Sequence, residues 1–398
     1  MKKQRILIAL ATLLIILFCS SFFNNFINQT EEVTIDKREY ERLKQFEELM
    51  SVYKVIDERY YIEPDYAKLK EGAVRGMLKG LDDDYSIYYN PKEFEEYWEN
   101  DEGQYAGIGV QIQRNFEEKV CRITRVFKNS PAEEMGIKKG DLLIKAGEIE
   151  VTPESLDEAV KYIRGEIGTK ADIVLLRGEE EIPLAVERRQ IQINLIESTM
   201  LDNKIGIIQL FEFSGESGKE FAAEYNALKD KGMQGLILDL RDNPGGWVEN
   251  ARGIADLFIE NDTLCYFEYR DGSREYIKTG PGKTSIPMVV LINENSASAS
   301  ELLSGCFRDY GLADIVGVTS FGKGIAQEVL PVGDNGAGFQ FTVAQYFTPK
   351  GVAVHKKGIT PDYVVELNEE EKNIDYDLGD LDDKQLAKAY EVIQTKLK

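Results

Sequence analysis

A continuous apolar segment, Gly235 to Leu240, constrains the fold of this chain more than any other feature. An apolar run without polar alternation is typical of a strand that is buried on both faces, as in a parallel sheet covered by helices. A second run, Ile286 to Ile292, has the same character, and segments with helical spacing separate the expected strands. From about residue 189 to residue 366 the sequence therefore predicts an α/β domain.

The second apolar run leads into a serine-rich stretch, Ser296 to Glu301. Ser298 stands between the end of the expected strand and the start of an expected helix, where free N–H groups and the helix dipole favour developing negative charge. This position is typical of a nucleophile. Ser298 and Glu301 also form the pattern S-x-x-E, a capping box that commonly does no more than start a helix. Both interpretations are open at this point.

The chain has a single histidine, His355. A Ser-His-Asp arrangement would depend on that residue alone. If the chain is a serine hydrolase that does not use it, another group must act as the base, and lysine is the usual substitute.

Composition narrows the ligands that the chain can bind. The net charge of −22 over 398 residues argues against nucleic acid or an anionic membrane surface as a partner. The sequence contains no C-x-x-C motif and no histidine cluster, so we expect neither a metal nor a cofactor. Of the four cysteines, Cys121, Cys265 and Cys306 lie beyond the N-terminal apolar segment, and we expect them to be buried thiols.

The N-terminal segment Ile6 to Phe23 is uncharged and long enough to cross a membrane once. Lys2, Lys3 and Arg5 precede it, so the rest of the chain should lie outside the cytoplasm. A cleaved signal peptide is the competing interpretation. Because no A-x-A site follows the apolar run, we predict an uncleaved anchor in residues 1–30, with a secreted form as the weaker alternative.

Four further regions follow the anchor. Residues 31–102 should be helical, since Phe46, Leu49, Met50 and Tyr53 recur at spacings of three and four. Residues 103–188 are rich in short strands, 189–366 form the α/β core, and 367–398 are an acidic tail that closes in a helix. The helical region and the tail are candidates for a homodimer contact.

Residues 103–188 contain short apolar segments separated by glycine turns. The sequences Asn129 to Ala132 (N-S-P-A), Gly136 to Ile137 and Gly140 to Leu143 (G-D-L-L) follow one another there. Their order resembles that of a bacterial PDZ domain. The alternative is a small β domain whose glycines only turn the chain.

The PDZ resemblance implies that this region binds a peptide. The N–H groups of Gly107, Ile108 and Gly109 are expected to hold a terminal carboxylate while the peptide adds as a strand beside Val110. The expected partner is a protein or peptide with an apolar free C-terminus. The other wall of the groove is expected to be a helix with the apolar residues Leu156, Ala159, Val160 and Ile163.

Five motifs in order resemble those of the C-terminal processing (tail-specific) serine peptidases, family S41. They lie at Gly76 to Ser86, Asp239 to Gly246, Ser296 to Glu301, Phe321 to Gln327 and Gly358 to Asp362. The resemblance covers nearly all of the chain from about residue 45 onward. It implies a crotonase/ClpP-like α/β peptidase core with a helical N-terminal segment and an inserted β-rich PDZ domain.

The resemblance also implies a role for each site residue. Ser298 would be the nucleophile, Lys323 the general base and Gln327 the residue that orients the lysine. The oxyanion donors would be the Ala299 amide and an amide of the Gly245-Gly246 turn, and the sequence does not tell which glycine donates. Asp239, Arg241 and Glu301 would support the site, and His355 would be structural.

We therefore expect a membrane-anchored, extracytoplasmic serine endopeptidase that captures apolar C-terminal tails and cleaves through an acyl-enzyme. The PDZ region would also gate the site by moving. A catalytically inactive PDZ scaffold that binds protein C-termini is the first alternative, and another acyl-transfer enzyme on a crotonase-like sheet is the second. The physiological substrate and the oligomeric state are not encoded in any motif that we recognise.

Overall fold

The computed structural model describes residues 34–397, apart from 102–103, 116–118, 193, 283, 373 and 375. The expected membrane anchor in residues 1–30 lies outside the described residues. Among the described residues, no helix combines the length and the apolar character that a membrane crossing needs. The chain divides into two compact units, Met1–Ala73 and Val74–Lys398.

The first unit is helical in its described part, as the apolar spacing predicts. It contains α2 (Lys37–Lys44), α3 (Glu47–Arg59) and the first half of α4 (Tyr66–Lys79). Asp36 caps α2, because its carboxylate accepts hydrogen bonds from the N–H groups of Arg38 and Glu39 at 2.7 and 3.0 Å. Neither α2 nor α3 has a buried residue.

The PDZ region forms a sheet in the strand order β3-β4-β5-β7-β8, with β6 paired to β5. The strand bounds are Val110–Asn115, Val120–Val126, Leu142–Ala146, Lys170–Arg177, Glu180–Glu187 and, for β6, Ile149–Glu150. The short helix α6 (Pro131–Glu134) and the helix α7 (Leu156–Ile163) complete this region. β3 lies at one edge of the sheet, as its alternating sequence predicts.

Two strands mark where the chain enters and leaves this inserted region. β2 (Gln104–Gly107) pairs antiparallel with β9 (Arg189–Gln192). The chain thus returns beside its own point of departure, which is what an insertion between two parts of one fold requires.

The α/β core contains a six-stranded sheet in the order β10-β11-β12-β15-β16-β19. Only β10 is antiparallel to its neighbour, and every residue of β12 and β15 is buried. The two continuous apolar runs are therefore central parallel strands, as predicted. The strand bounds are Ile196–Leu201, Ile205–Leu210, Gly235–Asp239, Met288–Ile292, Ala313–Gly317 and Tyr363–Val364.

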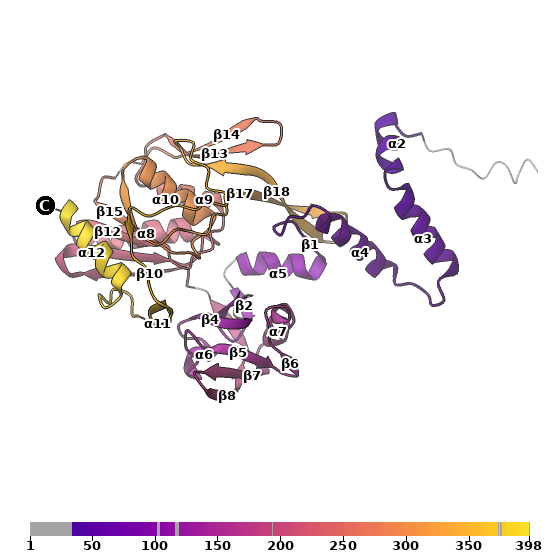
Figure 1. The fold of residues 1–398 in the computed structure, drawn as a ribbon, viewed down its shortest axis with the longest axis horizontal. Coiled ribbons are helices and arrows are strands. Elements are labelled where there is room, and N and C mark those ends of the chain that lie inside the picture. Colours follow the sequence, from indigo (N-terminus) through magenta and orange to yellow (C-terminus); the bar gives the residue numbers. More distant parts are fainter. Residues whose placement is uncertain are drawn as a thin grey trace, which may run out of the picture. The chain divides into compact units, whose positions relative to one another are not determined.

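Alternate residues of these strands face two separate apolar layers. Leu236, Leu238 and Val290 pack into the layer that includes α8 (Ser217–Asp230), α9 (Val248–Ala255) and α10 (Ala299–Asp309). Ile237 and Val289 face the layer that includes α12 (Lys384–Lys396). Figure 1 shows α12 in yellow beside this sheet. The period of two along a strand produces this division.

A second sheet has the order β1-β18-β13-β14, and β17 also pairs with β18. β17 and β18 form a hairpin, because they are joined through the glycine-containing turn at residues 333–336 and pair antiparallel. β17 begins two residues after Lys323, so this sheet carries one side of the site. The bounds are Ile87–Tyr89 for β1, Ala337–Phe347 for β18, Thr263–Tyr269 for β13, Arg274–Lys278 for β14 and Ile325–Val332 for β17.

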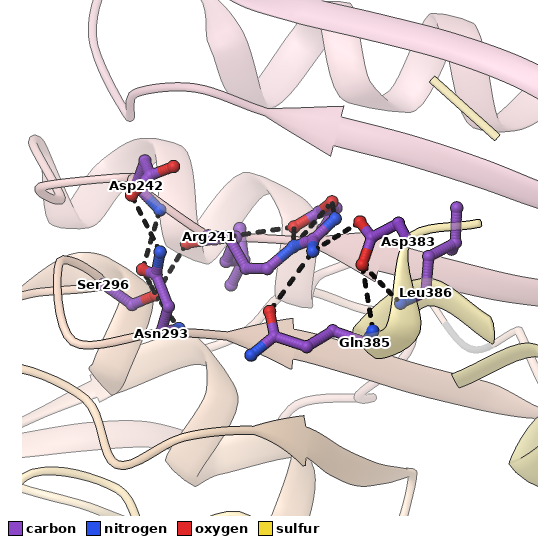
Figure 2. A network of polar contacts seen from close by, with 9 residues as sticks. Arg241, Asp242, Asn293, Ser296, Asp383, Gln385 and Leu386 are labelled. Atoms are coloured by element: carbon purple, nitrogen blue, oxygen red, sulfur yellow. Dashed lines mark hydrogen bonds and ion pairs between the residues drawn. The ribbon is translucent and has the colours of Figure 1, made fainter. Parts of the chain in front are cut away.

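A buried ionic network attaches the C-terminal helix to the end of β12. Arg241 contacts the Asp239 carboxylate at 2.6 Å and the Asp383 carboxylate at 2.7 Å, and its guanidinium also donates to Gln385 (Figure 2). Asp383 is the N-cap residue of α12 and accepts from the N–H groups of Gln385 and Leu386. Burial alone would lower the pKa of Arg241, but the two carboxylates outweigh burial and raise it. The helix of the acidic tail is thus part of the folded core.

Candidate active site

Ser298 occupies the turn between β15 and α10 in a backbone conformation that is rare for serine. Its φ is +54° and its ψ is −115°. Such a conformation costs on the order of 1–3 kcal/mol in a residue with a side chain, and it persists only where the surroundings impose it. Ser298 is also the N-cap residue of α10 and forms a capping box with Glu301. The two interpretations of the S-x-x-E pattern are therefore compatible.

Neighbouring hydrogen bonds impose this turn. Asn243 O accepts from the N–H of Ala297 and from the hydroxyl of Ser300, both at 3.0 Å. Ser296 Oγ donates to Leu240 O at 2.8 Å and accepts from Asn293 N at 2.9 Å. Figure 2 includes Ser296 and Asn293 beside the Arg241 segment. The ends of β12 and β15 are thereby fastened to each other on both sides of Ser298.

The buried carboxylate of Glu301 joins the turn at Ser298 to the segment that carries Lys323. Its Oε2 accepts from Ser298 N at 2.9 Å and from Lys323 N at 2.8 Å. Its Oε1 accepts from Ser320 Oγ at 2.6 Å and from Gly322 N at 2.7 Å. Burial raises the pKa of Glu301, while these four donors act in the opposite direction.

A second bridge between the same two segments comes from β18. The Tyr346 hydroxyl lies 2.9 Å from Ser298 O and 2.7 Å from Lys323 O, within hydrogen-bond distance of both. Burial raises the pKa of Tyr346 well above its ordinary value, so the group remains a neutral donor. Ser298 and Lys323 are thus connected through one carboxylate and one hydroxyl.

Lys323 lies in an environment that disfavours its charge. Burial lowers its pKa below the ordinary value of 10.5, and the negative charges of Asp83 and Glu301 oppose that effect. Its Nζ lies 4.5 Å from the centre of the Tyr85 ring. Among the described residues, the structure records no hydrogen bond from this amine to Ser298 Oγ or to Gln327. Catalytic hydrogen bonds commonly shorten only when substrate is bound.

The positions on both sides of Lys323 require glycine for steric reasons. A Cβ on Gly324 would lie 2.2 Å from His355 N, and Gly322 has a φ of +93°. His355 therefore packs against this segment through its backbone. Its Nδ1 is buried without a hydrogen-bond partner among the described residues, and burial, helped by Lys356, lowers its pKa.

Gln327 lies in β17 and its amide nitrogen donates to Thr342 Oγ1 at 3.2 Å. A β-bulge shifts the register between Ala326 and Gln327, and Lys323 precedes the strand. The expectation that an even spacing places Lys323 and Gln327 on one face therefore does not apply directly. Both residues nevertheless line the same cleft.

The two glycines after β12 differ in what their amides do. Gly245 N donates to Asn243 Oδ1 at 2.9 Å. Gly246 forms a parallel bridge with Phe213 through its neighbours' backbone groups, and its own N–H has no hydrogen-bond partner among the described residues. The same holds for the N–H of Ala299, the first residue of α10. Gly245 lies closest to the nucleophile, since a Cβ there would be 2.7 Å from Ser298 Cβ.

One cleft of about 880 Å³ contains Ser298 and Lys323 and continues into the PDZ region. Val110 and Ile112 line it from β3, Ile108 lines it from the connection before β3, and Val160 and Ile163 line it from α7. Leu156 and Ala159, which we expected in the groove wall, are instead buried in the core of the PDZ region. That part of the groove prediction is wrong, because the helix turns those two residues inward.

The PDZ residues that are predicted to hold a carboxylate lie directly before β3 and at its first residue. Gly107 ends β2, while Ile108 and Gly109 are buried in the connection to Val110. Gly109 has a φ of +91°, and a Cβ there would lie 2.2 Å from Ser130 Cβ. Phe127 N donates to Gly109 O at 3.0 Å and holds this connection in place.

Sequence reasoning missed four groups of the site. Asn243 and Tyr346 hold the turn at Ser298, the Tyr85 ring lies against the Lys323 amine, and the charge of Asp83 raises the pKa of that amine. Asn243 lies within the motif at Asp239 to Gly246, and Asp83 and Tyr85 lie within the motif at Gly76 to Ser86, so each of these three had a signal in the sequence. No local pattern identifies Tyr346, because its role depends on a contact across 48 residues.

Comparisons with known proteins identify the family of the chain. Peptidase family S41 matches residues 204–365, the PDZ domain family matches 122–177, and a family described as the activating protease CtpB N-terminal domain matches 17–93. The carboxy-terminal processing protease CtpA of Bacillus subtilis is 38% identical over 325 residues, covering 81% of this chain and 69% of the relative. CtpB of the same organism is 32% identical over 328 residues, covering 81% and 68%.

Solved structures share the fold. The photosystem II D1 C-terminal processing protease superposes with a TM-score of 0.58 at 25% identity, over 80% of this chain and 92% of that one. A putative S41 protease from Bacteroides fragilis has a TM-score of 0.55 at 15% identity, over 85% and 91%, and is similar in fold. The chain belongs to peptidase family S41 and is a serine protease of the carboxy-terminal processing type with a PDZ domain.

Proposed function

We propose that this protein is a membrane-anchored, extracytoplasmic endopeptidase that captures the apolar C-terminus of a protein substrate and cleaves the chain upstream of it. Ser298 is the nucleophile, Lys323 is the general base and Gln327 orients the lysine. The observation that carries the proposal is the shared oxygen of Glu301, which accepts from both Ser298 N and Lys323 N. A purely structural helix cap has no need to hold a buried lysine in addition.

The proton transfers follow from the residue types. The neutral amine of Lys323 accepts the proton of Ser298 Oγ as the oxygen attacks the scissile carbonyl carbon. The tetrahedral intermediate collapses, the Lys323 ammonium gives its proton to the leaving amine, and an ester to Ser298 remains. Water, deprotonated by the same amine, hydrolyses the ester. Burial favours this cycle because it lowers the pKa of Lys323 and enlarges the neutral fraction near pH 7.

The oxyanion of the intermediate needs two donors. We assign them to Ala299 N–H and Gly246 N–H, because the Gly245 amide is already bonded to Asn243. Helix α10 adds the partial positive charge of its N-terminus at the same point. The sequence leaves the choice between the two glycines open. We propose Gly246 because the N–H of Gly245 already donates to Asn243.

Tail capture uses β3, which ends the strand order of the PDZ sheet. A peptide strand added there would place its terminal carboxylate at the N–H groups of Gly107, Ile108 and Gly109, while Val110 and Val160 contact its apolar side chains. The cleft that continues from this edge to Ser298 supports a single path for the substrate.

The anchor is proposed from the sequence alone. Residues Ile6 to Phe23 would cross the membrane, with the positively charged end inside. Alkaline carbonate extraction of cell membranes tests it: the full chain should stay in the membrane pellet, and a chain without residues 1–30 should not. A homodimer through the helical region remains a prediction, which sedimentation of the full chain in detergent tests.

The test of the activity uses the full chain and an unstructured peptide that ends in small apolar residues. Cleavage is followed by mass spectrometry for the free-acid peptide and for the same peptide with an amidated end. We expect cleavage that is lost in Ser298→Ala and Lys323→Ala and reduced for the amidated peptide. Binding of the free tail without any cleavage would favour the inactive scaffold. Cleavage that survives Lys323→Ala would exclude the lysine base.

A further inference from the structure

The turn at residues 82–86, which lies within the first of the five motifs, lies against β18, the partner of the strand that begins two residues after Lys323. β1 pairs with β18 in the register Tyr88 to Phe339. Gln340 Nε2 donates to Tyr85 O at 3.1 Å, and Thr342 N donates to Ser86 Oγ at 3.4 Å. These bonds place the turn beside Lys323 although more than 230 residues separate them in sequence.

Two side chains of this turn act on the Lys323 amine, one through its ring and one through its charge. The Tyr85 ring lies under Nζ, and an ammonium over an aromatic face is attracted by the negative potential of the ring. The Asp83 carboxylate acts on the amine through its charge. The two oxygens of this carboxylate accept hydrogen bonds from Tyr85 N at 3.1 Å and from Ser86 Oγ at 2.7 Å, which fix the position of the negative charge.

The titratable groups around the Lys323 amine differ in their hydrogen-bond partners and in their charge. All four hydrogen bonds that the described residues give to Glu301 come from Ser320 and from backbone N–H groups. Tyr85 and Tyr346 are neutral, since burial raises the pKa of each. Burial also pulls the pKa of Asp83 upward, but hydrogen bonds from Ser86 and Thr342 and the charge of Lys323 outweigh it, so this pKa is below its ordinary value.

Asp83 also reaches Gln327 through Thr342. Thr342 N donates to Ser86 Oγ, which donates to Asp83, and the Thr342 hydroxyl helps to lower the pKa of Asp83. The oxygen of the same hydroxyl accepts from Gln327 Nε2 at 3.2 Å. A hydroxyl has one proton, so a threonine that donates to Asp83 can only accept from Gln327. The amide nitrogen of Gln327 must then face Thr342, which leaves the amide oxygen free to accept from the lysine.

We propose that Asp83 is a positioning residue for the Lys323 base: acting through the Thr342 hydroxyl, it sets the orientation of the Gln327 amide, and together with the Tyr85 ring it holds the amine at the site. The proposal rests on the function proposed above, in which Lys323 is the base. The motif at Gly76 to Ser86 thereby gains a role in the chemistry of the motifs that contain Ser298 and Lys323. The alternative is that Asp83 only closes its own turn by accepting from Tyr85 N.

Asp83→Asn separates the two roles, because asparagine keeps an oxygen that can accept from Tyr85 N but has no charge. Its amide group can also donate to Thr342, which would reverse the hydrogen bonds and turn the nitrogen of Gln327 toward the lysine. Without the negative charge, the protonated lysine loses stabilisation. The acidic limb of the kcat/KM profile should therefore move to lower pH, and kcat on the plateau should fall about tenfold or more.

Thr342 gives a matched pair that does not alter any charge. Thr342→Val removes the hydroxyl at constant shape and should lower kcat about tenfold while KM stays within about twofold. Thr342→Ser restores the hydroxyl and should recover most of that loss. The exposed neighbour Asp84 is the control, because Asp84→Asn removes the same charge from the same turn and should leave the profile in place.

The experiment measures kcat and KM from pH 6 to pH 10 for the full chain and these four variants with the free-acid peptide, together with the thermal unfolding midpoint of each. Lys323→Ala is measured first. If Lys323→Ala cleaves, the proposed function is wrong. If Lys323→Ala is inactive while folded Asp83→Asn keeps the acidic limb of the wild type, or Thr342→Val keeps its kcat, this inference alone is overturned.

Discussion

Replacing Glu301 by glutamine removes one negative charge and one acceptor oxygen while keeping the shape of the side chain. In the wild type, Oε2 accepts from Ser298 N and Lys323 N, and Oε1 accepts from Ser320 Oγ and Gly322 N. The new amide group has to face one of these pairs. Whichever way it turns, at least one buried backbone N–H loses its acceptor.

The magnitude follows from counting these donors. With the amide toward Ser320, the hydroxyl can reorient and only the Gly322 N–H is left unpaired. A buried unpaired donor costs about 1–3 kcal/mol, and the two bonds that remain lose their assistance from charge, which costs about 1 kcal/mol more. We therefore expect Glu301→Gln to lower the free energy of unfolding by about 2–4 kcal/mol, a large part of the roughly 5–15 kcal/mol that stabilises a typical domain.

The assay is urea unfolding at pH 7, followed by tryptophan fluorescence and by circular dichroism. Glu220→Gln, in the first turn of α8, is the matched control, because Glu220 is exposed and its loss should change stability by no more than about 0.5 kcal/mol. If Glu301→Gln is as stable as this control, the carboxylate does not hold the two segments together, and the reasoning about the site is refuted.

Three further predictions concern the same core. Gly245→Ala would place a Cβ 2.7 Å from the Cβ of Ser298 and should reduce the rate of cleavage about 100-fold. Gly253→Ala in α9 is the control, because a Cβ there would have no neighbour closer than 3.7 Å and should leave the rate unchanged. Equal rates for the two variants would contradict the close approach of Gly245 to Ser298. Arg241→Met leaves two buried carboxylates unpaired and should lower the free energy of unfolding by about 3–5 kcal/mol in the urea assay, and a loss below about 1 kcal/mol would show that the pairs are dispensable. Cleavage should increase with pH as Lys323 loses its proton, with a midpoint below the ordinary lysine value of 10.5 because burial lowers its pKa; a midpoint at or above that value in a kcat/KM profile would contradict the burial.

Features that depend on neighbouring residues could be predicted from the sequence. The apolar runs at Gly235 to Leu240 and Ile286 to Ile292 contain the central parallel strands β12 and β15, since burial on both faces excludes polar residues. The helix start at Ser298 followed from the capping pattern of Ser298 and Glu301. These patterns involve only a few neighbouring residues, so they predict the local structure without knowledge of the long-range contacts.

Features that depend on long-range contacts could not be predicted. Glu301 could be recognised as a helix cap, but its bonds to Gly322 and Lys323 require a segment about 20 residues away to fold onto it. The motif that contains Asp83 could be recognised, but its contact with β18 could not be predicted, because that strand lies more than 250 residues further along the chain. The helix α7 was correctly predicted, but which of its apolar residues face the groove depends on the rotation of the helix.

The central claim is that Ser298 forms a covalent acyl intermediate with the help of Lys323. The most direct measurement is to mix the full chain with an activated ester of the tail peptide, quench in acid within the first turnover, digest the protein and locate the added acyl mass. The account predicts the acyl group on the peptide that contains Ser298, with formation slowed strongly in Lys323→Ala and absent in Ser298→Ala. An acyl group on another residue, or an unchanged rate in Lys323→Ala, would contradict it.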